Sequence, residues 1–287
     1  MCLVWCVVAT GAFLGVRATE ASARRSLDQR SALRAQVGAR FVASYVDELF
    51  RRELTQANGV LAADVVSASD FELAVKNMNF PAAVLLDEAG HALHVWPPKP
   101  EVVGTDLAAK YTHLRLATTG RRAISTVVPA AVKGTPIVAF ALPFDTASGP
   151  RVFSGGFDLS TTPLASFLQN ATPIQPNLVL LVDGEGGVVA GSTQDPRRTQ
   201  LTDLNPRLAR AWGEQKYGAY SEAGRHYRYT SHSVEGTTWR LLLSLPTDQL
   251  YAPLDSGNLV LRGLALALVV VTAVIAALIV RLSRRTR

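Results

Sequence analysis

Two short stretches of the sequence decide the fold: Ala83-Val-Leu-Leu-Asp-Glu-Ala-Gly90 and Leu178-Val-Leu-Leu-Val-Asp-Gly-Glu-Gly186. In each stretch an apolar run ends in an Asp, and a Gly follows three residues later. The two motifs lie 96 positions apart, and each is followed by a second apolar run. This pattern is typical of a β-hairpin with a tight turn. Its repetition predicts two similar lobes in tandem.

Further apolar runs fill out both lobes. We expect a hairpin partner at 91–96, and strands at 123–128, 136–142, 152–157 and 239–245, with a short helix at 164–168. Leu142-Pro-Phe-Asp145 in the first lobe has an echo in Leu245-Pro-Thr-Asp248 of the second. The fold class predicted is α+β, with two tandem mixed lobes built on antiparallel sheets.

A long helix is expected before the first lobe. Residues 20–56 contain no Pro and one Gly, and apolar residues recur at helical spacing, with Asn58-Gly59 as a typical helix end. Its apolar stripe is wider than one lobe can cover, so we expect that the helix can pair with a second copy in a homodimer.

Both ends of the sequence carry apolar runs. Residues 264–280 include one Thr and no charge, which predicts a transmembrane helix, and the arginines that follow predict a cytoplasmic C-terminal end. Residues 2–16 are apolar but short. Three interpretations remain open for them: a cleaved signal peptide, an uncleaved transmembrane helix, or a first helix cut short by a misplaced start codon. We favour the uncleaved helix, and all three place the main domain outside the cytoplasm.

Charge and cysteine content exclude several classes of function. The net charge is +6, but the basic residues are dispersed and do not alternate with aromatics, so no nucleic-acid partner is expected. The two cysteines, Cys2 and Cys6, lie in the first apolar run, so the lobes contain neither a disulfide framework nor a cysteine metal site.

Five motifs together resemble the bacterial Cache domains, which are PAS-like extracytoplasmic sensors, in their double-lobed form. The motifs are Ala83–Gly90, Val103-Gly-Thr-Asp-Leu107, Thr119-Gly-Arg-Arg-Ala-Ile-Ser125, Thr135–Pro143 and Gly155-Gly-Phe-Asp-Leu-Ser160. The resemblance covers most of residues 30 to 255.

The resemblance implies a receptor layout. Residues 1–18 would form a transmembrane or signal-anchor segment, 19–59 the long helix, 60–172 the membrane-distal Cache lobe and 173–256 the membrane-proximal one. Residues 259–282 would form the transmembrane helix and 283–287 a cytoplasmic tail. The distal lobe would bind a small ligand, and the helices would carry the signal to a separate cytoplasmic partner, because we expect no output domain on this chain.

The ligand-binding residues are expected between Lys110 and Asp158. The candidates are Tyr111, His113, Arg115, Arg121, Ser125 and Asp158. Arginines can hold a carboxylate through paired hydrogen bonds, although exposed, solvated arginines explain them equally well. Asp158 can hold an amine or cap the helix that follows it. An amino acid, an amine or a carboxylate is therefore the expected ligand class.

The pattern departs from that of amino-acid-binding members. Tyr111 and Arg115 match that pattern loosely, but no Trp-Tyr pair follows them. Amino-acid binding is therefore not specified by these motifs. The alternative to a sensor is a membrane-anchored scaffold that docks an envelope protein.

Catalysis finds little support. His91 and His94 lie in the expected hairpin, where residues three apart point to opposite faces, so no metal site is expected. Gly184-Glu-Gly-Gly187 fits a tight hairpin turn better than a phosphate loop. Neither an enzyme activity nor a cofactor is expected.

Overall fold

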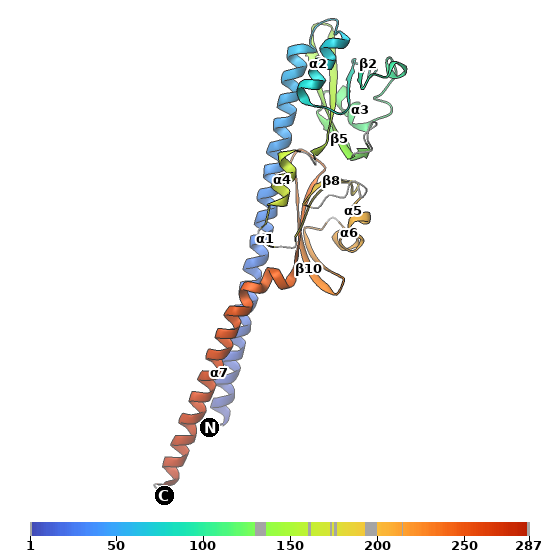
Figure 1. The fold of residues 1–287 in the computed structure, drawn as a ribbon. Helices are drawn as coiled ribbons and strands as arrows, with labels where there is room; N and C mark the ends of the chain where they lie inside the picture. The colour runs from blue at the N-terminus through green and yellow to red at the C-terminus, as the bar shows by residue number, and fades with distance from the viewer. Residues whose placement is uncertain are drawn as a thin grey trace. The chain divides into compact units, whose positions relative to one another are not determined.

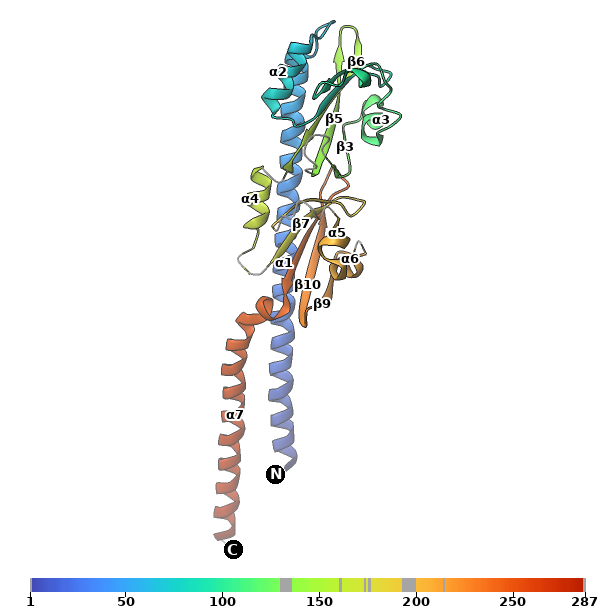
Figure 2. The same ribbon diagram turned by 45° about the vertical axis from the view of Figure 1, so that its right-hand side comes forward.

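The computed structural model describes residues 2–129, 136–159, 162–172, 174, 177–192, 200–213 and 215–285, with some residues near both ends described by backbone only. The chain divides into two compact units, Met1–Leu33 with Pro246–Arg287, and Arg34–Leu245. Figures 1 and 2 show the order of the elements.

The first unit consists of helix ends. α1 runs without interruption from Cys2 to Val60, so the predicted segments 1–18 and 19–59 are parts of one helix. α7 spans Thr247–Arg285 and begins well before the predicted start at 259. The Tyr251 hydroxyl donates to Asp28 Oδ1 at 2.8 Å, and the Arg24 guanidinium lies 5.0 Å from the Tyr251 ring centroid. These contacts tie the start of α7 to α1.

Within the described side chains, no helix carries an apolar stretch long enough to span a bilayer. Much of the predicted segment 259–282 lies outside those side chains, so that prediction rests on the sequence.

The second unit holds two antiparallel sheets, as predicted. The sheet of the first lobe, which we call distal after the predicted layout, has the order β2-β1-β6-β5-β3, with β4 also paired to β5. Its strands are β1 Ala83–Leu86, β2 Ala92–Trp96, β3 Ala123–Ile124, β4 Val128–Pro129, β5 Pro136–Thr146 and β6 Gly149–Phe157. The helical segments of this lobe are α2 Ala68–Met78, the 3-10 turn η1 Pro100–Val102 and α3 Thr112–Thr118.

The proximal sheet has the order β8-β7-β11-β10-β9, which repeats the distal order strand for strand. Its strands are β7 Leu178–Val182, β8 Val188–Gly191, β9 Tyr217–Glu222, β10 Arg225–Ser233 and β11 Arg240–Pro246. The helices are α4 Pro163–Gln169, α5 Leu201–Leu204 and α6 Pro206–Trp212. The matching topologies confirm the tandem lobes predicted from the repeated hairpin.

The repeated motif has the same structure in both lobes. Asp87 Oδ1 accepts the N–H groups of Ala89 and His91, and Asp183 Oδ1 accepts those of Glu185 and Gly187. Gly90 and Gly186, three residues after the two Asp residues, have φ angles of 89° and 85°, a region of backbone conformation that favours Gly. Side-chain acceptance of these turn N–H groups explains why Asp precedes each turn.

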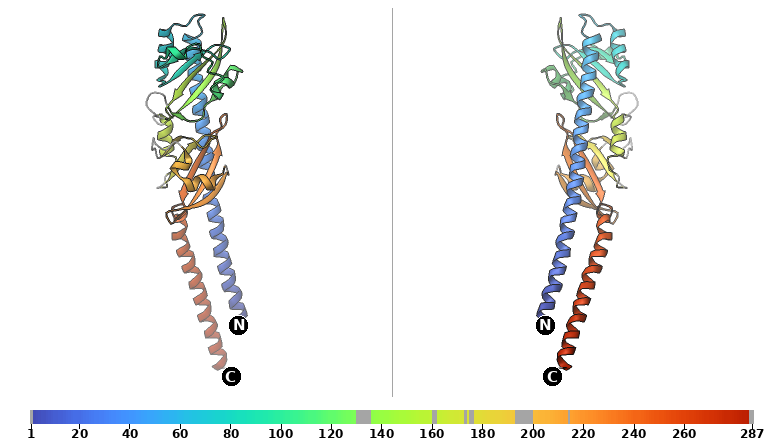
Figure 3. Two further views of the ribbon diagram at one scale, coloured as in Figure 1. Left: turned by 90° about the vertical axis from the view of Figure 1, so that its right-hand side faces the viewer. Right: turned by 90° about the vertical axis from the view of Figure 1, so that its left-hand side faces the viewer.

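The residues between Arg34 and Val60 line both sheets. Phe50 meets Phe140 of β5 edge-to-face at 5.1 Å. Gly38 allows Leu241 of β11 to approach, since a Cβ on Gly38 would lie 2.5 Å from the Leu241 side chain. In the right-hand view of Figure 3, this part of α1 crosses the sheets of both lobes. One helix face therefore completes two cores.

A buried carboxylate links the lobes. Asp183 is 2% exposed, and its Oδ2 accepts the Val127 N–H of the distal lobe at 2.8 Å. Trp239 of the proximal lobe meets Phe140 of the distal lobe, with ring centroids 6.1 Å apart. The Asp87 carboxylate, by contrast, makes its described contacts only within its own turn. Its Oδ1 accepts the turn N–H groups, and its Oδ2 lies 3.6 Å from His91 Nδ1.

We expect Asp183→Ala to destabilise the protein by about 2–4 kcal/mol, because it leaves three backbone N–H groups without their acceptor. Asp87→Ala, the matched change in the exposed copy of the turn, should cost about 1 kcal/mol. Urea unfolding followed by tryptophan fluorescence measures both. Equal losses for the two variants would contradict a linking role for Asp183.

Candidate site beneath α3 in the distal lobe

The distal sheet has two covered faces. Side chains alternate along β6, so Phe153 faces α1 and α2, where it meets Phe71 and Phe80, while Val152 faces α3. The cluster under α3 contains Leu86, Ala92, Leu107, Leu114, Ala117, Ala141 and Val152. The side chains of α3 therefore pack on the sheet face opposite α1.

Two predicted residues meet at the start of α3. Tyr111 is the residue before the helix and is 39% exposed, and its ring centroid lies 6.0 Å from that of His113. The Lys110 ammonium lies 5.4 Å from the Tyr111 ring centroid. Arg115 is exposed on the same helix. Tyr111 and His113 thus form a partly open aromatic pair, and Arg115 projects into solvent.

Burial changes the chemistry of His113. Desolvation lowers the pKa of its imidazole from 6.5 to about 4. The ring is therefore neutral at physiological pH, with one nitrogen able to donate a hydrogen bond and the other able to accept one.

The other three predicted residues lie apart. Arg121 is exposed, next to Arg122, which pairs with Asp47 at 2.7 Å. The Ser125 hydroxyl accepts the Ala139 N–H at 2.9 Å and donates to the Thr126 carbonyl at 2.7 Å, so it fastens the chain to β5. Asp158 is half-buried directly after β6 and has an interaction partner. The N-cap position of α4 is Thr162, so Asp158 does not cap that helix.

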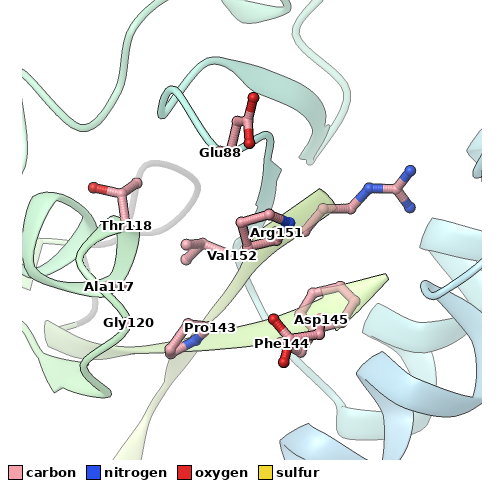
Figure 4. A pocket seen from close by; sticks show the side chains of 10 residues that line it. Glu88, Ala117, Thr118, Gly120, Pro143, Phe144, Asp145, Arg151 and Val152 are labelled. Atoms are coloured by element: carbon pink, nitrogen blue, oxygen red, sulfur yellow. The ribbon is translucent and has the colours of Figure 1, made fainter. Parts of the chain in front are cut away.

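A cavity of about 250 Å³ lies where α3 ends above the β5–β6 hairpin. Glu88, Thr118, Asp145 and Arg151 bring polar groups to its lining, and Pro143, Phe144, Pro150 and Val152 bring apolar ones. Figure 4 shows the Glu88 and Thr118 side chains on one side and the hairpin on the other. The volume is just below the usual range for drug-sized ligands, so the space suits a small molecule.

The guanidinium of Arg151 is turned away from this cavity (Figure 4). It donates to the carbonyls of Leu61, Ala63 and Asp64 at 2.9, 2.6 and 2.7 Å, and to Ser148 Oγ at 3.0 Å. Arg151 thus fixes the loop after α1 to the hairpin. Its hydrogen-bonding capacity is largely used there, and its apolar stem lines the cavity.

The carboxylates of Glu88 and Asp145 therefore dominate the charge at the cavity. Both side chains are exposed at its rim, and Thr118 adds a hydroxyl. Such a lining attracts a cationic group and disfavours a free carboxylate. None of the six predicted residues lines this cavity, and their role stays a prediction. The sequence carried a signal for Asp145 in the Leu-Pro-Phe-Asp motif, but none for the orientation of Arg151.

The proximal lobe is filled by its own aromatic residues. Trp212, Tyr220 and Tyr229 are buried in one cluster with Leu180, Leu208 and Leu242. The Tyr229 hydroxyl donates to the Ala211 carbonyl at 2.7 Å, and the Tyr220 hydroxyl lies 2.9 Å from Ser244 Oγ. Tyr217, at the start of β9, is by contrast 73% exposed. Packing, rather than a binding face, explains the cluster.

Metal-type clusters are absent from the described part of the chain: no group of three His, Cys, Asp or Glu side chains converges there. His91 lies beside Asp87, whereas His94 Nε2 lies 2.9 Å from the Val66 carbonyl and its ring faces Phe71. The two histidines thus have different surroundings, as the hairpin prediction requires.

Comparison with known proteins gives structural similarity only. No protein-family model and no curated protein matches the chain. The ligand-binding domain of the Pseudomonas fluorescens chemoreceptor CtaA, in complex with L-isoleucine, matches with a TM-score of 0.60 at 16% identity, over 82% of this chain and 98% of that domain. That of the Pseudomonas aeruginosa chemoreceptor PctB, in complex with L-Arg, gives 0.59 at 16% identity, over 80% and 92%.

A longer receptor matches over part of its length. The chain spans 40% of an extracellular ligand binding receptor from Desulfohalobium retbaense, with 75% of this chain covered, a TM-score of 0.53 and 17% identity. The chain therefore has the fold of bacterial chemoreceptor ligand-binding domains. This confirms the resemblance to Cache sensor domains at the level of the fold.

We expect acid to destabilise the distal lobe through His113. The imidazole pKa is lower in the folded chain, so the unfolded chain binds more protons between pH 6.5 and about 4, and stability falls as the pH falls through this window. The full effect is at most about 3 kcal/mol. His113→Asn should remove this part of the pH dependence in urea unfolding. An unchanged pH profile would show that the imidazole is solvated in the folded chain.

Proposed function

We propose that the chain is an extracytoplasmic sensor domain of a bacterial signal-transduction receptor, and that its distal lobe binds a small molecule bearing an amino group. The cavity beneath α3, with Glu88 and Asp145 at its rim, carries the proposal. The shared fold supports it, because domains of this fold have been solved with L-isoleucine and L-Arg bound.

The amino group is the part of the ligand that these side chains favour. A charge-assisted hydrogen bond from an ammonium to a carboxylate contributes about 1.5–3 kcal/mol. Thr118 can accept or donate one further hydrogen bond, and Val152 with the two prolines offers an apolar wall. An amine fits this set of groups, and a dicarboxylate does not.

Membrane attachment completes the proposed receptor. The apolar run 264–280 is long enough to cross a bilayer, and the arginines after it place that end in the cytoplasm by the positive-inside rule. The distal and proximal lobes would then lie outside the cytoplasm. This arrangement rests on the sequence.

A homodimer through α1 belongs to the same proposal. Val37 is 56% exposed and Phe41, one turn later, is 41% exposed, although Phe41 also stacks on Phe167 of α4 at 4.1 Å. Sedimentation of the full chain in detergent should show a dimer that Val37→Glu dissociates. A wild-type monomer at high concentration would contradict this part.

The ligand is tested by thermal shift with a panel of L-amino acids, diamines and dicarboxylates. An amine-bearing compound at a hundred times its dissociation constant should stabilise the protein by about 2.7 kcal/mol. Glu88→Gln and Asp145→Asn should each weaken binding roughly tenfold or more, because each removes one charge-assisted contact.

Arg121→Ala and Asp158→Asn provide the matched controls at the predicted residues. If these two variants abolish the shift and the rim variants do not, the sensor function stands but its ligand lies at the predicted residues. If no compound on the panel shifts the transition, the scaffold alternative replaces the sensor, and a protein partner should be sought.

A further inference from the structure

Glu53 is a fully buried acid on α1. Its side chain is 0% exposed. Oε1 accepts the backbone N–H of Gly155 in β6 at 3.1 Å, and Oε2 has no hydrogen-bond partner among the described residues. A carboxylate with one unsatisfied oxygen in a protein interior is costly, so this group needs a physical explanation.

Aromatic rings surround the Gly155 end of this contact. A Cβ on Gly155 would lie 2.1 Å from a ring carbon of Phe80, so Gly is required where the ring and the helix both approach the strand. Phe80 meets Phe157 at 4.7 Å, and Phe157 meets Phe140 at 5.0 Å. Desolvation in these surroundings raises the pKa of Glu53 well above 4.5, and the single hydrogen bond from Gly155 only partly opposes it.

The charged groups of the elements around Glu53 are engaged or exposed elsewhere. On α1, Arg52 is exposed and Asp47 pairs with Arg122, whose guanidinium lies 5.1 Å from the Phe50 ring centroid. Other charged groups on the packed elements include the Glu48–Arg51 and Glu72–Lys76 pairs, Asp70 at the start of α2, Asp87 after β1, Asp145 at the far end of β5, Arg151 bound to the loop carbonyls, and Asp158 after β6, while Arg40 and the charged residues before it lie more than three turns of α1 away from Glu53. Burial, and not a charged partner, therefore raises the pKa of the carboxyl.

The strand that Glu53 holds also lines the candidate site. Gly155 donates its N–H to the helix side chain, and the next residue, Gly156, donates to the Ala82 carbonyl at 2.8 Å. Three residues before Gly155, Val152 lines the cavity from the opposite face of the sheet. A change at Glu53 is therefore transmitted to the cavity wall through one short length of backbone.

We propose that Glu53 is a proton-operated latch between α1 and β6. The neutral carboxyl accepts the Gly155 N–H and lets the helix lie against the strand. Loss of its proton places an unpaired charge among aromatic rings, which favours an arrangement in which α1 and β6 separate enough to admit water. The pH-dependent contact between Glu53 and β6 needs no ligand. Only its role in regulating the cavity rests on the proposed sensor function.

The sign of the pH effect follows from the raised pKa. The folded chain keeps the Glu53 proton to a higher pH than the unfolded chain does, so the stabilisation is full below pH 4.5 and is lost as the pH rises toward the folded-state pKa. Within that window the folding equilibrium constant falls by up to tenfold per pH unit for this one proton. A rise in pH through this window therefore opens the latch.

The test is hydrogen exchange, read by mass spectrometry, on the full chain in a non-ionic detergent. Peptides covering 150–157 report on β6. Wild type, Glu53→Gln and the matched helix variant Glu48→Gln are compared with each other at pH 5 and again at pH 8. At each pH the protection factor of the 150–157 peptides in a variant is divided by that in wild type. For Glu53→Gln we expect this ratio to be at least ten times larger at pH 8 than at pH 5. For Glu48→Gln the ratio should stay near one at both pH values.

Each outcome decides the proposal. A ratio between Glu53→Gln and wild type that is the same at both pH values would show that Glu53 is merely structural and overturn the latch. Should Glu53→Gln fail to fold, infrared difference spectra of wild type and Glu48→Gln replace it. A protonated carboxyl band retained at pH 6 and lost at higher pH in both proteins supports the latch, and its absence at pH 6 overturns it. None of these measurements needs a ligand, so their failure is distinct from failure of the sensor proposal.

Discussion

The second half of α1 is shared by two cores, and most of the unit Arg34–Leu245 depends on that sharing. Val42, Val46, Leu49 and Phe50 are each 3% exposed or less. Burying a side chain of this size contributes about 1.5–3 kcal/mol. Each sheet alone has one face without a cover, and the same helix supplies the missing layer for both. A displacement of α1 would therefore change the environment of both lobes at once.

The two lobes share a topology but differ in how their interiors are used. The proximal lobe fills the space between its sheet and α6 with Trp212, Tyr220 and Tyr229. The distal lobe covers its sheet with smaller side chains such as Ala117, Ala141 and Val152, and a cavity remains at the end of α3. Aromatic rings bury large areas and stabilise a lobe without a ligand. The proximal interior is therefore filled by its own rings, whereas the distal lobe keeps a cavity beside its smaller side chains.

The sequence predicted the fold well because the decisive residues act locally. Asp87 and Asp183 accept turn N–H groups within four residues, and helical spacing in 20–56 needs only α1 itself. The site was less accessible to sequence reasoning, because its residues act over long separations. Nothing in the sequence signals that the Arg151 guanidinium bonds carbonyls 87–90 positions earlier in the chain. Ser125 likewise lies in a suggestive motif but bonds backbone, and Glu53 looks like one more polar position on an amphipathic helix.

Two groups on opposite faces of the distal sheet give the lobe opposing responses to pH. His113, on the α3 side, is neutral when folded and takes up a proton on unfolding below pH 6.5, whereas Glu53, on the α1 side, holds a proton when folded and releases it on unfolding above pH 4.5. Where both groups titrate, unfolding gains protons at His113 and loses them at Glu53, so their contributions to the pH dependence oppose each other. The Glu53 contribution differs from that of His113 in that it acts at a contact between β6 and the helix that both cores share.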